Sequence, residues 1–163
     1  MLGAGFLPDS EREKAMADAR DSLRKKWQSE QEELKKKPLK IQFSYWDGSG
    51  HPSAASVVVG DTVADFLKAA RLVLETDFPS LRHITVSNLL LVVHNILVPQ
   101  ATSFHRLIVG KAHNTKGDAL FELEGKKRKL HTVKVLSRHW YESNKHIYPA
   151  NCWQTFDEDV HMA

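Results

Sequence analysis

Histidine has the most obvious chemical potential in this sequence, because imidazole binds zinc and transfers protons near neutral pH. The chain of 163 residues contains nine histidines, but no two of them stand four positions apart with a glutamate between them. Its single cysteine, Cys152, has no second thiol with which to share a metal ion. Zinc sites normally draw on such compact spacings, so the sequence predicts scattered structural histidines and neither a metal nor a cofactor.

The segment Phe43–His51, FSYWDGSGH, carries Gly48 and Gly50 and raises the question of a phosphate-binding loop. Glycines at this spacing can bring backbone amides to a phosphate, but such loops continue into a Lys-Ser/Thr pair or a helix. The residues after His51 look like a strand instead. No Gly-x-Ser-x-Gly sequence marks a nucleophilic serine, and nothing beside Cys152 marks a catalytic thiol. We therefore expect neither an enzyme nor a small-molecule substrate.

Aromatic and basic side chains are interleaved near the C-terminal end, over residues 138–153. Exposed rings beside cations can stack on single-stranded RNA or anchor a protein interface. The same rings can instead fold back and close the open end of a sheet, with the charges outside. We favour burial for most of the rings and take four residues as candidate partner contacts: Tyr141, Asn144, Lys145 and His146.

Two runs of cations are candidate contacts for RNA phosphates. The first is Lys35, Lys36 and Lys37, and the second is Lys126, Lys127, Arg128 and Lys129. Lysine and arginine release counterions when they meet a phosphate backbone, and such contacts position RNA without reading its sequence. The second run also resembles a nuclear localisation signal. A solvated loop between strands is an equally good interpretation of this run.

The composition is that of a single globular domain. The apolar fraction is 42% and the net charge is +3, which permits an acidic partner without requiring one. The longest apolar run, Leu89–Val93, is far too short for a membrane span, and the N-terminal residues lack a secretory signal pattern. A lone cysteine fits a reducing compartment. We expect no membrane contact.

A charged helix is the first element that must position these residues, over residues 11–38, after a disordered leader at residues 1–10. A narrow apolar stripe recurs along it at helical spacing: Met16, Ala19, Leu23, Trp27 and Leu34. So thin a stripe cannot form a core, so the helix either lies against the domain or reaches out to a partner. Its candidate partner contacts are Arg24, Lys25, Lys26 and Trp27.

A β-hairpin is predicted next. Ile41, Phe43 and Tyr45 alternate with polar residues, as in a strand with one buried face. The Asp-Gly pair at Asp47 is a strong turn signal, because the turn needs the positive φ angles that glycine tolerates. The second strand is expected over Ser53–Val59. The candidate partner contacts at the tip are Trp46, Asp47, Ser49 and His51.

The remaining periodicities complete the fold. A helix capped by Asp61 or Thr62 should run to about residues 77–79, and a second helix is expected over residues 102–113. Strands are expected over residues 88–93, 96–98, 120–123 and 132–136. A hairpin followed by a helix across the sheet predicts an α+β, ubiquitin-like β-grasp-type mixed sheet with packed helices, preceded by the long charged helix. The globular α+β domain should span residues 39–157, before a flexible tail at residues 158–163.

Several long motifs resemble the C-terminal domain of the XAP-five, or circadian-timekeeper, family of eukaryotic nuclear proteins. They are FLPD at Phe6–Asp9, FSYWDGSGH at Phe43–His51 and WYESNKHIYPANCW at Trp140–Trp153. The similarity runs in the same order from Phe6 to Asp157. Family members usually carry a long charged region ahead of the FLPD element, so functions of that region are not carried over to this chain.

The resemblance implies a nuclear, non-catalytic component of the spliceosome and of pre-mRNA splicing, and in plants a link to the clock. It implies spliceosomal proteins as partners, with snRNA or pre-mRNA backbone as a further contact, and gives no indication of a homo-oligomer. The alternative is a chromatin- or transcription-linked binding module outside the spliceosome. Composition and spacing by themselves indicate only an intracellular binding domain.

Overall fold

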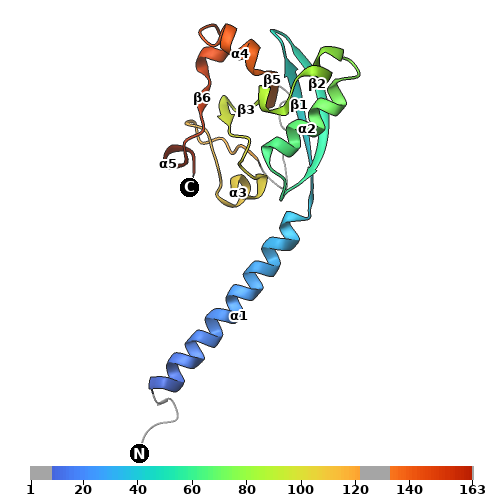
Figure 1. The fold of residues 1–163 in the computed structure, drawn as a ribbon. Helices are drawn as coiled ribbons and strands as arrows, with labels where there is room; N and C mark the ends of the chain where they lie inside the picture. Colours follow the sequence, from blue (N-terminus) through green and yellow to red (C-terminus); the bar gives the residue numbers. More distant parts are fainter. Residues whose placement is uncertain (1–8, 122–132, 163) are drawn as a thin grey trace, which may run out of the picture.

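The computed structural model describes residues 9–121 and 133–162. A long helix, α1 (Asp9–Lys35), projects from one end of an α+β domain (Figure 1). At about 1.5 Å per residue it is about 40 Å long. None of its residues is buried, although Leu34 in its last turn packs against the domain core. The long charged helix predicted from the sequence is therefore present.

The hairpin follows the predicted alternation. Strands β1 (Pro38–Trp46) and β2 (Gly50–Val58) pair antiparallel, with Trp46 opposite Gly50 at the tip and Pro38 opposite Val58 at the base. Ile41, Phe43 and Tyr45 are buried, as their period of two predicts.

Helix α2 (Val63–Leu74) crosses one face of the hairpin (Figure 1). Thr62 is its N-cap, and a capping box joins Thr62 to Asp65. The helix ends earlier than predicted, since the chain turns after Leu74, whose carbonyl accepts from the amides of Asp77 and Phe78. A short 3-10 element, η1 (Pro79–His83), follows this turn. Its buried face packs on Phe43, whose ring meets Phe66 edge to face at 5.5 Å.

The described strands form one mixed sheet in the order β2-β1-β5-β3-β4-β6. The further strands are β3 (Leu89–Val93), β4 (Ile96–Val98), β5 (Val133–Ser137) and β6 (Gln154–Thr155). Strand β5 lies parallel to β1 and antiparallel to β3, so it joins the hairpin to the second half of the sheet. This result confirms a mixed α/β sheet with packed helices.

Short helical elements complete the chain. They are η2 (Val86–Asn88), α3 (Phe104–Val109), α4 (Arg138–Asn144), η4 (Ala150–Cys152) and α5 (Glu158–His161). Helix α3 is shorter than predicted, since the chain turns at Gly110 and Lys111 has a positive φ of 51°. Leu120 and Phe121 are buried but lie outside any regular strand, which corrects the start of the strand predicted at residue 120. Helix α5 occupies four of the positions assigned to the tail.

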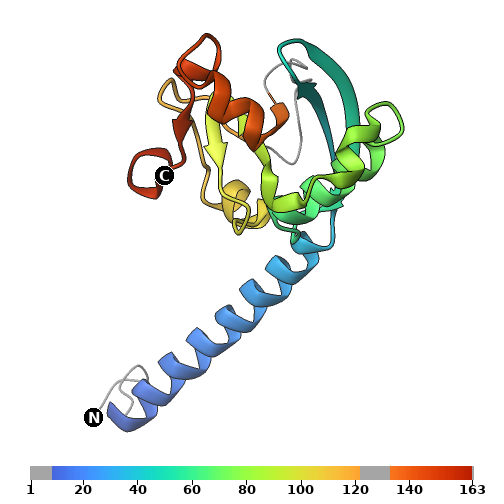
Figure 2. The same ribbon diagram turned by 45° about the horizontal axis from the view of Figure 1, so that its top comes forward.

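The sheet separates two apolar clusters. The larger lies under α2 and α3 and contains Phe43, Phe66, Phe104 and Leu107. The smaller consists of Val92, Leu136, Ala150 and Trp153, and partly buried rings from the hairpin tip and α4 pack against it. Figure 2 shows α4 and the chain after it on the side of the sheet that the second cluster occupies. The second cluster therefore fixes the C-terminal residues against the sheet.

Candidate interaction site

The hairpin turn is built by its own polar side chains. Gly48 has a φ of +107°, as the Asp-Gly signal predicts. One carboxylate oxygen of Asp47 accepts hydrogen bonds from the Ser49 amide at 3.2 Å and from the Ser49 hydroxyl at 3.2 Å. The same oxygen lies 3.1 Å from Nε2 of His51. Three of the predicted contact residues thus serve first to hold the turn together.

This Asp, Ser and His group does not have the geometry of a catalytic triad. In a triad the carboxylate and the serine contact different ring nitrogens of the histidine. Here the Ser49 hydroxyl lies 3.3 Å from the same Nε2 atom that meets Asp47. Partial burial raises the pKa of Asp47, but hydrogen bonds from the Ser49 amide, His51 and the Ser49 hydroxyl outweigh it, so the pKa is lowered overall. An ionised carboxylate that organises a turn accounts for the group.

The ring of His51 belongs to a second contact that the sequence analysis missed. It meets Phe78 edge to face at 5.0 Å, and Phe78 in turn lies 4.7 Å from the ring of Tyr45. Burial, and then the charge of Asp47, raises the pKa of the Tyr45 hydroxyl. Phe78 therefore covers part of the His51 ring, in addition to the contacts that Asp47 and Ser49 make with its Nε2 atom.

Trp46 brings the hairpin tip and the C-terminal segment into one site. Its ring meets Trp140 edge to face at 6.1 Å, and Trp140 lies 6.2 Å from Trp153. Tyr141 stacks on Trp153, with 6.1 Å between ring centroids and 12° between planes. Trp153 is buried, whereas Trp46, Trp140 and Tyr141 are partly exposed. The rings fold back on the sheet, as favoured from the sequence, and they leave an aromatic surface at their rim.

A lysine on the central strand β5 also contacts this surface. The amine of Lys134 lies 5.8 Å from the ring centroid of Trp46, within the range of a cation–π contact. Burial lowers the pKa of Lys134. The sequence places Lys134 between Val133 and Val135, so a period-two pattern would put it on the opposite face from the main core. Its pairing with Trp46 depends on strand order, which the local pattern does not reveal.

The polar residues of the tail differ in their availability. The Asn144 side-chain amide donates to the carbonyl of Trp140 at 2.8 Å and so stabilises the end of α4. Lys145 forms an ion pair with Glu142 at 3.2 Å. His146 is exposed, and the Tyr148 side chain is 78% exposed. Residues 145–148 are all exposed and include two of the four predicted contacts, Lys145 and His146.

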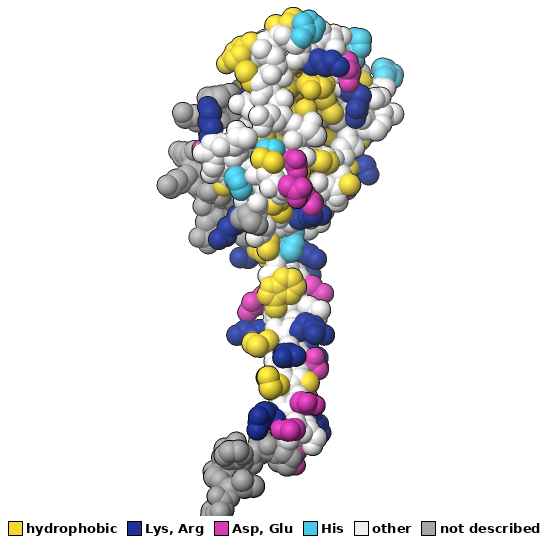
Figure 3. All heavy atoms as spheres, turned by 90° about the vertical axis from the view of Figure 1, so that its left-hand side faces the viewer, with side chains coloured by type: hydrophobic (Ala, Val, Ile, Leu, Met, Phe, Trp, Pro, Cys, Tyr) yellow, Lys and Arg dark blue, Asp and Glu magenta, His cyan; other side chains and the backbone are white. Residues whose placement is uncertain are grey.

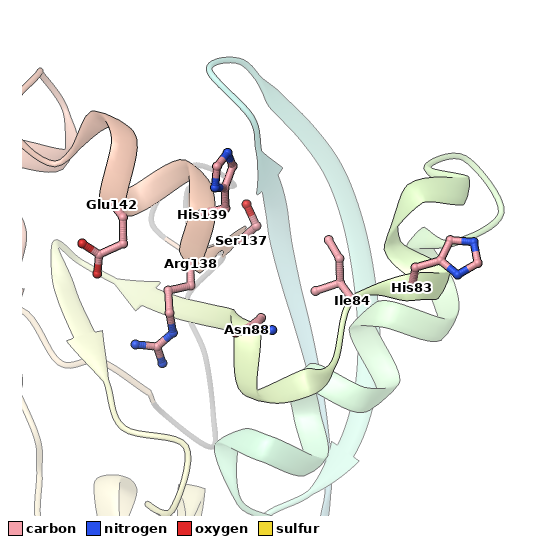
Figure 4. A pocket seen from close by; sticks show the side chains of 7 residues that line it. All are labelled: His83, Ile84, Asn88, Ser137, Arg138, His139 and Glu142. Atoms are coloured by element: carbon pink, nitrogen blue, oxygen red, sulfur yellow. The ribbon is translucent and has the colours of Figure 1, made fainter.

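Two open clefts flank this region, each of about 400 Å³. The first lies between α4 and the η1–η2 segment (Figure 4). Arg138 and Glu142 extend from α4 beside it, and Arg138 donates to the carbonyl of Ser87 at 3.3 Å. The second lies at the β3–β4 turn, between Asn114 and Tyr148. The lining of neither cleft followed from the sequence pattern, because each combines segments distant along the chain.

The contact residues predicted on α1 lie elsewhere. Arg24, Lys25, Lys26 and Trp27 are all exposed, with 55% of Trp27 accessible. Strand β1 begins just after α1 and runs away from it to the tip. The helix and the aromatic surface are therefore at opposite ends of β1, about 30 Å apart along a strand of this length. The structure does not gather all predicted contacts into one site.

Apolar side chains are visible along the exposed length of α1 (Figure 3). Met16, Leu23 and Trp27 are each at least half exposed. At about 100° per residue they lie on one line of the helix with Leu34, while Lys25 lies on the opposite face. Arg24 and Lys26 flank the line on either side. Lys25 therefore cannot contact the same flat surface as Trp27.

The base of α1 is tied to the domain. Gln31 Oε1 lies 2.6 Å from Nε2 of His105 on α3, and the carbonyls of Lys35 and Lys37 accept backbone hydrogen bonds from Gly60 and Val59. Burial, and then the nearby charge of Lys35, lowers the pKa of His105. The side chains of Lys35, Lys36 and Lys37 are exposed. They form a basic collar where the helix meets the domain.

The second basic run, Lys126, Lys127, Arg128 and Lys129, lies outside the described residues. Among residues 9–121 and 133–162, no three His, Cys, Asp or Glu side chains gather where they could hold a metal ion. Within the same ranges no helix is long and apolar enough to cross a membrane.

The chain matches a family model described as XAP5, circadian clock regulator C-terminal domain, over residues 37–132 and 122–163. It is 42% identical over 167 residues to the Protein XAP5 CIRCADIAN TIMEKEEPER of Arabidopsis thaliana, a match that covers 93% of this chain and 48% of the relative. The rice protein of the same name (Oryza sativa subsp. indica) is 39% identical, with coverage of 93% and 49%. The Protein FAM50 homolog of Drosophila melanogaster is 37% identical, with coverage of 96% and 46%.

The chain thus spans about half the length of the curated relatives it matches. None of these names refers to a chemical reaction. The match of the family model begins at residue 37, just after α1, so it covers the sheet, the hairpin tip and the aromatic surface.

Proposed function

Because the chain belongs to the XAP5, circadian clock regulator C-terminal domain family, we propose that it is a non-catalytic component of the nuclear pre-mRNA splicing machinery. It would act as a scaffold that contacts proteins and RNA. The motifs at Phe43–His51 and Trp140–Trp153 carry the resemblance on which the splicing link depends. The polar groups at the hairpin tip hydrogen-bond to one another and hold the turn, which supports a non-catalytic role.

The observation that carries this proposal is the exposed apolar line of α1. A helix of 27 residues without one buried side chain gains little from tertiary packing, which is the usual source of helix stability in proteins. Exposing Leu23 at 68% and Trp27 at 55% leaves apolar area in water. A groove on a partner protein would bury this line, with anchors at helical spacing.

The cations of α1 define how RNA would take part. Arg24 and Lys26 border the apolar line, so they can meet phosphates or acidic side chains at the rim of the same groove. Lys25 faces the other way and would reach a different neighbour. The collar of Lys35, Lys36 and Lys37, and the run from Lys126 to Lys129, are the proposed phosphate contacts.

The aromatic surface is the proposed second contact. Trp46, Trp140 and Tyr141 offer partly exposed rings held in place by Trp153, and rigid aromatic anchors are typical of interface hot spots. Asp47 and His51 at the tip, with Lys145 and His146 beyond α4, provide the polar rim. Since α1 lies at the other end of β1, the chain can bridge two neighbours in a large assembly.

A tagged pulldown from nuclear extract tests the proposal, with mild crosslinking and identification of proteins and small RNAs. The chain should recover spliceosomal RNAs and splicing proteins, with crosslinks on α1 or near Tyr141. Leu23→Ala combined with Trp27→Ala should reduce this recovery about tenfold, a loss equivalent to about 1.4 kcal/mol. The matched control is Glu32→Ala, an exposed position on the opposite face of the same helix, which should leave recovery unchanged. Equal recovery by the double variant would contradict a role for the apolar line.

A second candidate function follows from the printed names of the plant relatives, which describe circadian timekeepers. Regulation of a clock is compatible with a binding module linked to chromatin or transcription, acting in the nucleus but outside the spliceosome. The same pulldown separates the two functions. Histones or polymerase subunits without splicing proteins would favour the second candidate.

We also propose that the domain is a ubiquitin-like β-grasp. The support is its topology: an antiparallel hairpin, a helix across one face, and a later strand, β5, inserted parallel to β1. A backbone superposition of an experimental structure on ubiquitin-like domains would test this assignment, and a different strand order would contradict it.

A further inference from the structure

Strand β2 forms one edge of the sheet along nine residues. Natural edge strands are usually protected from pairing by short length, bulges, charged side chains or proline. The β2 sequence, GHPSAASVV, contains no Lys, Arg, Asp or Glu, and it pairs with β1 without a bulge. Pro52 is its one protective feature, and it stands near the tip. The middle of this edge, from Ala54 to Ser56, is therefore open to another strand.

The hydrogen bonds at the base of the hairpin show which backbone groups of β2 point away from β1. The Val58 amide donates to the Asp61 carboxylate at 3.0 Å, and the Val58 carbonyl accepts from the Asp61 amide at 3.0 Å. Val58 therefore directs its polar groups outward. In an antiparallel ladder the outward positions recur every second residue, so Ser56, Ala54 and Pro52 are the others.

These outward groups are unsatisfied within the described chain. The backbone hydrogen bonds outside the β1–β2 ladder, for residues 9–121 and 133–162, include none to Ala54 or Ser56. Pro52 lacks an amide at an outward position, which is where an edge strand tolerates proline. The free set is the two amides of Ala54 and Ser56 and the carbonyls of Pro52, Ala54 and Ser56.

An apolar flank of α2 overhangs this edge. Arg71 on the opposite flank donates to the carbonyl of Ile84 at 3.0 Å, toward the middle of the sheet. At about 100° per residue, Ala69 and Val73 face the other way, toward β2. Val73 is 45% exposed, and Ala69 is partly buried against the core. Figure 1 shows α2 lying across the hairpin, so this flank lies on the same face of the sheet as a strand added beside β2 would present to the helix.

We propose that the free edge of β2 binds an extended peptide segment of a partner protein, which adds to the sheet as a seventh described strand beside β2. Backbone hydrogen bonds to Ala54, Ser56 and the Pro52 carbonyl provide affinity, as in other cases of β-strand addition. Alternate side chains of the peptide point to Ala69 and Val73 and should be apolar. This surface differs from α1 and from the aromatic surface, so the inference does not depend on the splicing role.

A second copy of the chain fits the edge less well than a peptide does. Paired strands lie about 4.8 Å apart, whereas packed helices need about 8–10 Å between their axes. Of the strands in the sheet, β2 is the one on which α2 packs most extensively. Pairing β2 with β2 of another copy would bring two α2 helices into overlap. A bare peptide has no such helix.

The test starts with a displayed library of random peptides, selected on the full chain and followed by titration of the selected peptides. Ser56→Pro removes one outward amide, and with it one hydrogen bond to the peptide, and should weaken binding about tenfold, a loss equivalent to about 1.4 kcal/mol. The matched control, Ser56→Ala, keeps the amide and should bind within about twofold. Val73→Asp places a charge on the α2 flank and should also weaken binding. Because this variant leaves β2 unchanged, it tests the proposal even if Ser56→Pro fails to fold.

Amide hydrogen exchange supplies the second measurement. In the free chain, Ala54 and Ser56 should exchange faster than Ala55 and Val57, whose amides face β1. A selected peptide should slow the exchange of Ala54 and Ser56. The proposal would be overturned if the selected peptides left the exchange rates of these two amides unchanged, or if the library yielded no peptide that slows them. Concentration-dependent protection of the same amides together with a dimer in light scattering would also overturn it, by assigning the edge to a second copy.

Discussion

At the hairpin tip, the hydrogen-bonding groups of the polar side chains are largely satisfied within the turn itself. Asp47, Ser49 and His51 satisfy one another around a single carboxylate oxygen, and Phe78 covers part of the histidine ring. What a partner can reach is a rigid tip with an ionised carboxylate, not three free groups. The contact role proposed for these residues therefore depends on the shape of the turn as much as on their charges.

Gly48 gives a residue-scale prediction, because its φ of +107° is strained for any residue with a Cβ. Gly48→Ala should destabilise the domain by about 1–3 kcal/mol without a steric clash, since the nearest atom to an added Cβ is Trp140 Nε1 at 4.0 Å. Urea unfolding measures this change. Gly50→Ala is the matched control, because its Cβ would meet Ser44 at an ordinary 3.8 Å. Equal stability of Gly48→Ala and the wild type would show that the turn relaxes.

At the scale of elements, local periodicity predicted those parts whose burial is decided by near neighbours. Strand β4 (Ile96–Val98), the alternation of β1 and the N-cap Thr62 all follow from patterns within a few residues. The Asp-Gly signal likewise located the turn. Propensity and capping act over one or two turns of chain, so these elements are readable from the sequence alone.

Helix α4 was missed for the opposite reason. Its seven residues have no apolar stripe, and its rings are partly buried only because Trp46 and Trp153 come from distant parts of the chain. Ser137, whose hydroxyl accepts from the Trp140 amide, is the one local signal that marks its start. The same reasoning applies to the candidate site: its residue types were predictable, but the meeting of tip and tail depends on strand order.

The junction of α1 with α3 gives an element-scale prediction. The pKa of His105 is lowered from 6.5 by burial and by Lys35, so the folded protein holds that proton less tightly than the unfolded chain does. This contribution to stability is complete above about pH 6.5 and is lost as the pH falls through the folded pKa. His105→Gln removes the titration and keeps a donor for Gln31. Its urea midpoint should fall less between pH 7.5 and pH 5 than that of the wild type; an identical fall would place the pH sensitivity on other histidines.

At the scale of the whole molecule, the chain combines a packed domain with a rod that shares little of its core. The ties between them lie at the base of α1, where Gln31, Leu34 and the carbonyl of Lys35 meet the domain. The aromatic surface and the open edge of β2 belong to the domain, whereas the apolar line belongs to the rod. Substitutions that weaken binding by the exposed part of α1 should therefore leave the sheet folded.

Ala19→Pro tests this separation, because proline in a helix interior costs about 3 kcal/mol and removes a backbone hydrogen bond. The outer turns of α1 should unwind, which lowers the helical circular dichroism and the maximum dimension in small-angle scattering. The wild-type radius of gyration should exceed about 15 Å, the value for a compact chain of 163 residues. The melting temperature of the domain should stay the same, as it should for the control Ala19→Ser. A lower melting temperature for the proline variant alone would mean that α1 folds back on the domain in solution, where its apolar line would be buried without a partner.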